Sequence, residues 1–132
     1  MTNKPTPTPN LDTQAWWEAL TNGTVTAPQC EGCDALFFPP QPFCPRCGAA
    51  CVALKPLDPA GRVYSWVVAH RPFDPEWAKD VPYAIVAVDM SDGVRLTGRY
   101  LGDPADLIDG LPVVAQPYES HGPVLLGFSA GP

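Results

Sequence analysis

The chain has 132 residues and a formal charge of −6, from 14 acidic and 8 basic side chains. This excess of negative charge repels phosphate backbones and argues against nucleic-acid binding. No stretch approaches the roughly 18 apolar residues that a membrane span requires. We therefore expect a soluble cytoplasmic protein with one ordinary domain, or with a small module and a compact barrel. A large active-site cleft would have to be shared with another protein.

The first segment, residues 1–11, is polar and alternates threonine with proline, which predicts an extended, disordered tail. It has no apolar core of the kind found in secretory signals, which favours an intracellular protein. The whole chain contains 18 prolines and 11 glycines, so long helices are unexpected. The fold class predicted from these features is mainly β.

Residues 12–27 are predicted to hold a short helix and a linker, with Asp12 as the N-terminal cap and Asn22-Gly23 as the stop. Three apolar side chains gather on one side of this helix: Trp16, Trp17 and Leu20. A helix of about two turns is not stable alone. Its tryptophans must therefore pack against this domain or against another chain.

Residues 28–56 contain the strongest chemical pattern in the chain, two Cys-x-x-Cys pairs separated by ten residues. The four cysteines are Cys30, Cys33, Cys44 and Cys47. Two such pairs complete a tetrahedral sulfur site of the structural zinc type, so we predict a rubredoxin-like zinc ribbon. A short strand is expected between the pairs, over 35–38. So small a segment cannot build its own core, and the metal must supply folding energy on the order of 10 kcal/mol.

The second pair, Cys44-Pro-Arg-Cys47-Gly, is also typical of a rubredoxin knuckle that binds iron. Tetrahedral sulfur suits both metals. We favour one structural zinc per chain, because an electron carrier does not need the barrel that follows. The fifth cysteine, Cys51, is interpreted as a small apolar strand residue rather than a spare ligand or a reactive thiol.

Residues 57–129 are predicted to form a five-stranded barrel of the OB-fold type. Its five β-rich runs are Arg62–His70, Tyr83–Met90, Val94–Leu101, Val113–Glu119 and Val124–Phe128. The turns at Ser91–Gly93 and His121-Gly122 predict two tight hairpins. The segment Asp103–Gly110 fills the gap in which an OB-fold carries a short helix.

Four sequence elements together resemble a known family. They are Trp17–Leu20, the four ribbon cysteines, Gly61–Arg71 and Gly110–Val113. Over most of residues 15–128 the chain is similar to the OB-fold, acyl-CoA-associated zinc-ribbon proteins, long catalogued as a domain of unknown function. It departs from that family in its shortened helix and at Thr26-Ala27-Pro28, where the family usually has bulkier residues.

The resemblance implies a non-catalytic accessory subunit that docks on a thiolase-like enzyme or a hydratase and stabilises or activates it. Such enzymes act on acyl-CoA thioesters in acyl transfer, thiolysis or retro-aldol cleavage, including that of steroid side chains. The partner would then carry the catalysis in a hetero-oligomer.

His70 and Arg71 end the first barrel strand and precede a loop rich in aromatic and acidic residues. They are the candidates for binding CoA, because an arginine can hold an adenosine phosphate. The alternative is an ordinary strand end with a solvated arginine. Aromatic residues are the candidates for the partner interface, and they are Trp16, Trp17, Phe73 and Trp77.

No catalytic residues are predicted, since the chain lacks a Gly-x-Ser-x-Gly elbow, a phosphate loop and a His-Glu-x-x-His helix. Two alternatives to the accessory subunit remain. OB-folds and zinc ribbons also occur in nucleic-acid-binding proteins, although the negative charge opposes that function. An iron-loaded ribbon would instead make the chain an electron carrier.

Overall fold

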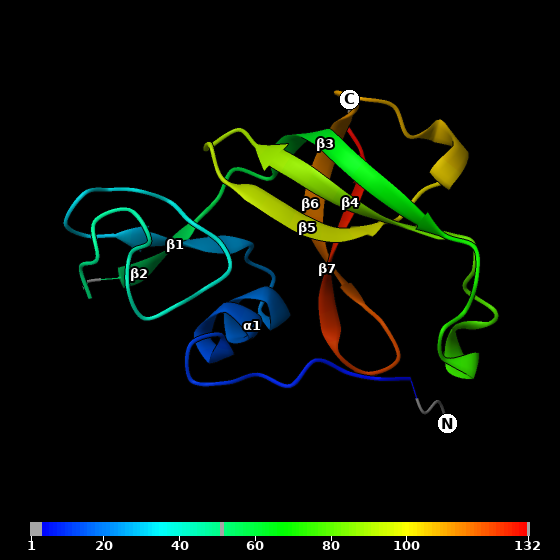
Figure 1. Ribbon diagram of the computed structural model, residues 1–132, viewed down its shortest axis with the longest axis horizontal. Helices are drawn as coiled ribbons and strands as arrows, with labels where there is room; N and C mark the ends of the chain where they lie inside the picture. The colour runs from blue at the N-terminus through cyan, green and yellow to red at the C-terminus, as the bar shows by residue number, and fades with distance from the viewer. Residues whose placement is uncertain (1–3, 51, 132) are drawn as a thin grey trace.

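The computed structural model describes residues 4–50 and 52–131, so Cys51 lies outside the described residues. One helix, a two-stranded sheet and a closed five-stranded barrel follow one another along the chain (Figure 1). The predicted mainly β fold class is confirmed. Within the described ranges, no helix is long and apolar enough to cross a membrane.

The helix α1 (Gln14–Thr21) begins after a turn that is held by Asn10. The Asn10 Oδ1 atom accepts hydrogen bonds from the backbone N–H groups of Asp12 (2.9 Å) and Thr13 (3.0 Å). The predicted cap, Asp12, is therefore wrong, because Asn10 already satisfies the amides that precede the helix. The predicted stop is confirmed, since Gly23 adopts a φ of +95° and its N–H bonds Leu20 O at 3.0 Å.

The ribbon is built on two antiparallel strands, β1 (Thr26–Cys30) and β2 (Val52–Pro56), that pair along their full length. The strand predicted over 35–38 is wrong, since only a single bridge joins Leu36 to Gln29. The two prolines that follow, Pro39 and Pro40, lack the N–H groups that would extend a ladder. The four ribbon cysteines therefore lie at the end of β1 and in the turns between the two strands.

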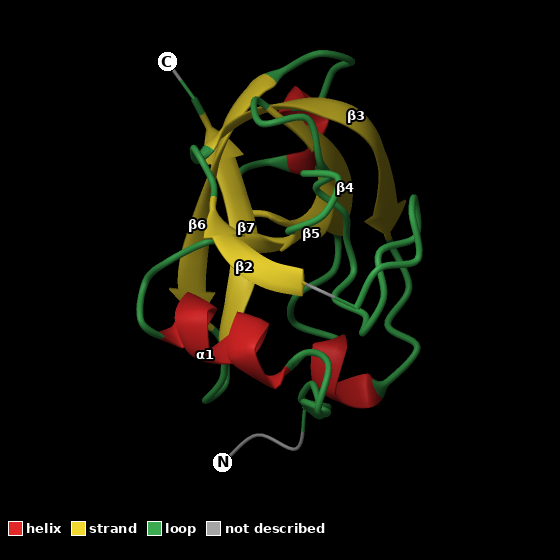
Figure 2. Ribbon diagram, turned by 90° about the vertical axis from the view of Figure 1, so that its left-hand side faces the viewer, coloured by secondary structure: helices red, strands yellow, loops and turns green. Residues whose placement is uncertain are grey.

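All five predicted barrel strands are present. They are β3 (Ala60–Ala69), β4 (Tyr83–Met90), β5 (Arg95–Tyr100), β6 (Pro112–Glu119) and β7 (Val124–Ala130). They close in the order β3-β4-β5-β7-β6, with β5 and β7 parallel and every other pair antiparallel. Figure 2 shows these strands curving around a common axis, with α1 below them. This arrangement is the OB-fold barrel that the sequence predicts.

Both predicted hairpin turns are present, between β4 and β5 and between β6 and β7. Positive φ angles occur at Gly93 (+94°), His121 (+41°) and Gly122 (+118°). The helix expected over 103–110 is only a single 3-10 turn, η2 (Pro104–Asp106), after which Leu107 enters the core. A second 3-10 turn, η1 (Pro75–Trp77), lies in the long loop after β3.

The helix α1 packs against β7 of the barrel and against β1 of the ribbon. Its side chains Trp16 and Leu20 are 5% and 0% exposed, and they belong to the same core as Phe128 and Val86 in the barrel. The sequence left open whether the helix packs on this domain or on another chain. For Trp16 and Leu20, it packs on this domain. The shared core fixes the ribbon and the helix against the barrel.

Gly98 on β5 lies where the barrel closes, since a Cβ atom there would be 2.6 Å from the backbone oxygen of Leu126. We expect Gly98→Ala to lower the free energy of unfolding by about 1–3 kcal/mol, because the β5–β7 pairing must open to admit the methyl group. Urea denaturation measures the change. The control Thr97→Ala, at the exposed neighbouring position, should cost less than about 1 kcal/mol. Equal stabilities of the two variants would contradict the close approach of β5 and β7 at Gly98.

Candidate metal centre and apolar cavity

The two cysteine pairs form turns of the same design. In the first, the N–H of Asp34 bonds Cys30 O and the N–H of Cys30 bonds Ala35 O, both at 2.9 Å. In the second, the N–H of Gly48 bonds Cys44 O at 2.9 Å. Backbone N–H groups also point at sulfur, with Gly32 N at 3.3 Å from Cys30 Sγ and Arg46 N at 3.4 Å from Cys44 Sγ. Such amides stabilise thiolates before any metal is bound.

The four cysteine sulfur atoms meet in one cluster, and all lie within 4.8 Å of one another. Cys30 and Cys47 are separated by 3.5 Å between sulfurs, and Cys33 and Cys44 by 3.7 Å. A tetrahedral zinc with bonds of about 2.3 Å would hold its sulfurs about 3.8 Å apart. The donor set and its spacing therefore fit zinc, and four thiolates would leave no open coordination position for catalysis.

The pKa values of Cys44 and Cys47 are shifted in opposite directions. The pKa of Cys44 is lowered to about 7. The largest cause is the hydrogen bond from the backbone N–H of Cys47; burial opposes it, and the N–H of Arg46 lowers the pKa further. The N–H of Ala49 lowers the pKa of Cys47, but the neighbouring thiols of Cys30 and Cys33 outweigh it and raise the pKa to about 12. A cation among the sulfurs would favour the thiolate forms, so metal binding would release protons and its affinity would fall as the pH falls.

A cavity of about 500 Å³ lies between α1, the ribbon, the turn η1 and the barrel. Residues far apart in the chain line it, among them Trp17, Phe38, Trp77, Ile85, Arg99 and Leu126. Its surface is mostly apolar, and the polar residues that line it include Arg99 and Tyr118. Burial raises the pKa of Tyr118, so its hydroxyl stays protonated at neutral pH. Sequence reasoning missed this cavity, because only the folded chain brings its walls together.

An ion-pair group borders the cavity at η1. Asp80 lies 2.6 Å from Lys4 Nζ and 3.8 Å from Arg99 Nη1, and the Lys4 ammonium lies 4.8 Å from the centre of the Trp77 ring. The His121 ring bonds Pro5 O at 3.1 Å through Nε2. These contacts place Lys4 and Pro5 against the barrel, and the disorder predicted for residues 1–11 stays a prediction.

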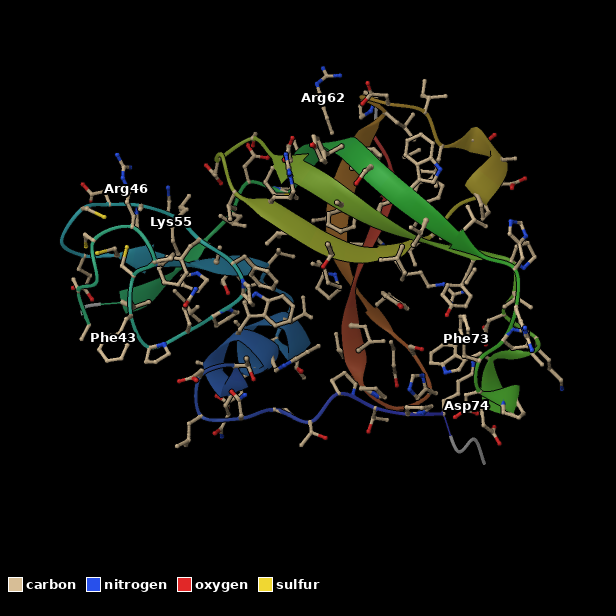
Figure 3. The ribbon with its side chains drawn as sticks, in the orientation of Figure 1. Phe43, Arg46, Lys55, Arg62, Phe73 and Asp74 are labelled. Carbon is tan, nitrogen blue, oxygen red and sulfur yellow. The ribbon has the colours of Figure 1, made fainter. Side chains whose placement is uncertain are left out.

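The four predicted interface residues have different surroundings. Trp16 is buried, its indole N–H donates to Thr26 O at 2.8 Å, and its ring lies 4.7 Å from that of Trp17. The structure therefore places Trp16 in the core, where it offers little surface to a partner. Trp17 and Trp77 are half-buried and line the same cavity. Phe73 is 92% exposed, at the opposite end of the molecule from the ribbon residue Phe43 (Figure 3).

The two predicted CoA-binding residues, His70 and Arg71, directly follow β3 and are exposed. They make no hydrogen bond or ion pair with the residues that the structure describes, and neither lines the cavity. Both side chains are accessible, and their contact with CoA stays a prediction.

Two family profiles match the chain in the order of its structural parts. Residues 17–51 match the rubredoxin-like zinc ribbon domain of ChsH2, and residues 54–116 match the C-terminal OB-fold domain of ChsH2. The chain belongs to the ChsH2 family. The resemblance found from the sequence is thereby confirmed, with both the ribbon and the barrel assigned.

A solved structure described as the Ltp2-ChsH2(DUF35) aldolase contains a chain of the same fold. The two chains are 32% identical with a TM-score of 0.85, over 95% of this chain and 98% of that one. A probable enoyl-CoA hydratase alpha subunit of Thermomonospora curvata is 36% identical over 84% of this chain, which spans only 34% of the relative's length. A DUF35 domain-containing scaffold protein of Methanocaldococcus jannaschii is 32% identical over 66% of this chain and 62% of its own length.

Proposed function

We propose that this chain is a non-catalytic accessory subunit that docks on a thiolase-like enzyme or a hydratase and stabilises or activates it. One observation carries the proposal. Over 95% of its length, this chain has the same fold as a chain of the Ltp2-ChsH2(DUF35) aldolase, whose name combines two proteins. The names of the hydratase subunit and of the scaffold protein support the same role. The substrates of the partner would be acyl-CoA thioesters, with steroid side chains as one class that the family resemblance implies.

The metal centre supports a structural role in this function. We propose that the four ribbon cysteines, Cys30, Cys33, Cys44 and Cys47, hold one zinc ion. The zinc would stabilise the ribbon, whose own buried cluster contains only Cys30, Phe37 and Cys44 among the described residues. A ribbon made rigid in this way would support the wall of the cavity at Phe38.

The surroundings of the arginines make the nucleic-acid alternative less favourable. Arg95 forms a bidentate pair with Asp89 at 2.6 and 3.2 Å, and Arg99 lies near Asp80. Arg62 donates a hydrogen bond to Gly110 O. Arg62 and Arg71 make no ion pair with the described residues, so two of the four barrel arginines keep an unpaired charge, against a net charge of −6 for the chain.

Reconstitution with enzyme subunits tests the proposal. The chain would be expressed with the thiolase-like and hydratase subunits encoded beside its gene, and each pair would be purified through a tag on one member. We expect one subunit to co-purify, to be inactive or unstable alone, and to turn over acyl-CoA when this chain is added. Turnover by the isolated chain at enzyme-like rates would contradict the proposal, as would a failure of every pair to assemble.

A further inference from the structure

The second half of β3 has an edge without a partner strand. β3 pairs with β6 only over Ala60–Arg62, and the last backbone bonds on that side join Val63 to Gly110 and Leu111, each at 2.9 Å. From 64 to 69, β3 pairs only with β4 among the described strands. Alternate residues of an antiparallel strand direct their N–H and C=O groups to opposite sides. On the side away from β4, the backbone groups of residues 64–69 therefore have no partner strand among the described residues, and this edge lies at the margin of the barrel in Figure 2.

The side chains of this edge do not protect it from pairing. Residues 64–69 contain no proline, glycine or charged residue, and Tyr64, Trp66 and Val67 are 53%, 36% and 67% exposed. The corresponding edge of β6, beyond its pairing with β3, carries Pro117 and Glu119. Proline and charge are common protection against edge-to-edge association. Residues 64–69 of β3 contain neither. The Arg95 guanidinium, which lies 3.5 Å from the centre of the Tyr64 ring, and a register irregularity between Val63 and Ser65 affect only the start of the edge.

We propose that residues 64–69 of β3 bind an extended segment of the enzyme subunit by strand addition. This inference rests on the proposed function, since the enzyme subunit supplies the added strand. Main-chain hydrogen bonds would give affinity, and the exposed side chains would select the residues of the incoming strand. The edge is also continuous with the cavity, because Val67 lies opposite Ile85 on β4, and Ile85 lines the cavity together with Trp17 and Trp77.

Charges at the two ends of the edge indicate the chemistry of the incoming segment. Arg62 precedes the edge, and His70 and Arg71 follow it. An apolar segment flanked by acidic residues would match this pattern. A second copy of this chain would not match it. Two copies paired antiparallel over 64–69 would place Arg62 of one opposite Arg71 of the other, and like charges directly opposite each other are destabilising.

Amide hydrogen exchange tests this binding mode, with the thiolase-like subunit that co-purifies with the chain as the probe, or the hydratase subunit if that one assembles. Strand addition should slow exchange in a peptide covering 64–69 by at least about tenfold in the complex. Docking through the cavity alone would slow exchange in residues 71–82 and leave 64–69 as in the free chain. That second result would overturn the inference and leave the proposed function intact. If neither subunit forms a complex, the proposed function and this inference both fail.

A charge at the edge tests the same point by affinity. Val67→Lys should weaken binding of the enzyme subunit about tenfold, because a lysine opposes strand addition. The matched control is Phe43→Lys, since Phe43 is 56% exposed but lies on the ribbon at the far end of the molecule (Figure 3). It should change the affinity by less than about twofold. Equal affinities of the two variants would overturn the inference. Light scattering that shows a dimer of the free chain, lost in Val67→Lys, would also overturn it by assigning the edge to a second copy.

Discussion

Replacing Cys44 with serine is expected to release the metal and unfold the ribbon. Cys44 is 2% exposed and contributes one of four sulfurs, and the ribbon's own cluster has only three buried residues within the described part of the chain. Structural zinc sites contribute on the order of 10 kcal/mol to folding, so three thiolates will not hold the native turns. Elemental analysis should find about one zinc per unaltered chain and far less in Cys44→Ser. Amide exchange should quicken throughout residues 28–56 in the variant.

The matched control for this variant is Arg46→Ser, in the same turn. Arg46 is exposed, and only its backbone N–H contacts the Cys44 sulfur. This control should keep its zinc and its ribbon, because serine retains that N–H. A Cys44→Ser protein with a full zinc ion and unchanged exchange would contradict the proposed metal centre. A visible iron spectrum in the unaltered protein would instead favour the electron carrier.

Loss of the aromatic side chains at the cavity is expected to disrupt docking of the enzyme subunit. Trp17 and Trp77 both line the cavity, and neither is fully buried in the free chain. Truncating a tryptophan at the centre of an interface often costs 2 kcal/mol or more, so each Trp→Ala change should weaken binding by about 30-fold. Titrating the enzyme subunit with each variant, and following acyl-CoA turnover, measures the loss.

Two controls separate docking from folding in this experiment. Phe43→Ala removes an exposed aromatic from the ribbon and should leave the affinity unchanged. Trp16→Ala removes a core side chain and its hydrogen bond to Thr26, so it should lower the free energy of unfolding by about 3–5 kcal/mol. If Trp17→Ala and Trp77→Ala remain folded and bind as tightly as the unaltered chain, the cavity is not the docking site.

Local sequence patterns predicted much of the barrel. The β-rich run of residues 83–90 gave the strand β4 with its bounds unchanged, because β-branched and aromatic residues favour strands. Turn residues placed both hairpins, since few residue types adopt positive φ angles at low cost. The two cysteine pairs predicted the sulfur cluster, because their spacing within each turn is short enough to be set locally.

Pairing between strands that are distant in the chain was not predicted from local patterns. The strands β1 and β2 were not predicted, because Pro28, Lys55 and Pro56 are poor strand residues and the two segments pair across more than twenty intervening positions. The helix α1 has Thr13 at its N-terminal cap position, and the turn before it is held by the Asn10 side chain, which the sequence analysis did not single out.

The sequence by itself determined the ribbon, the five barrel strands and the family, since all three depend on residue types at short, regular spacings. Tertiary structure alone decided that Trp16 enters the core while Trp17, its neighbour, lines a cavity with Trp77. It also decided that β3 ends in an edge with no partner among the described strands, because its pairing with β6 stops at Arg62. Both outcomes depend on contacts between segments distant in the chain, and these contacts have no local sequence signal.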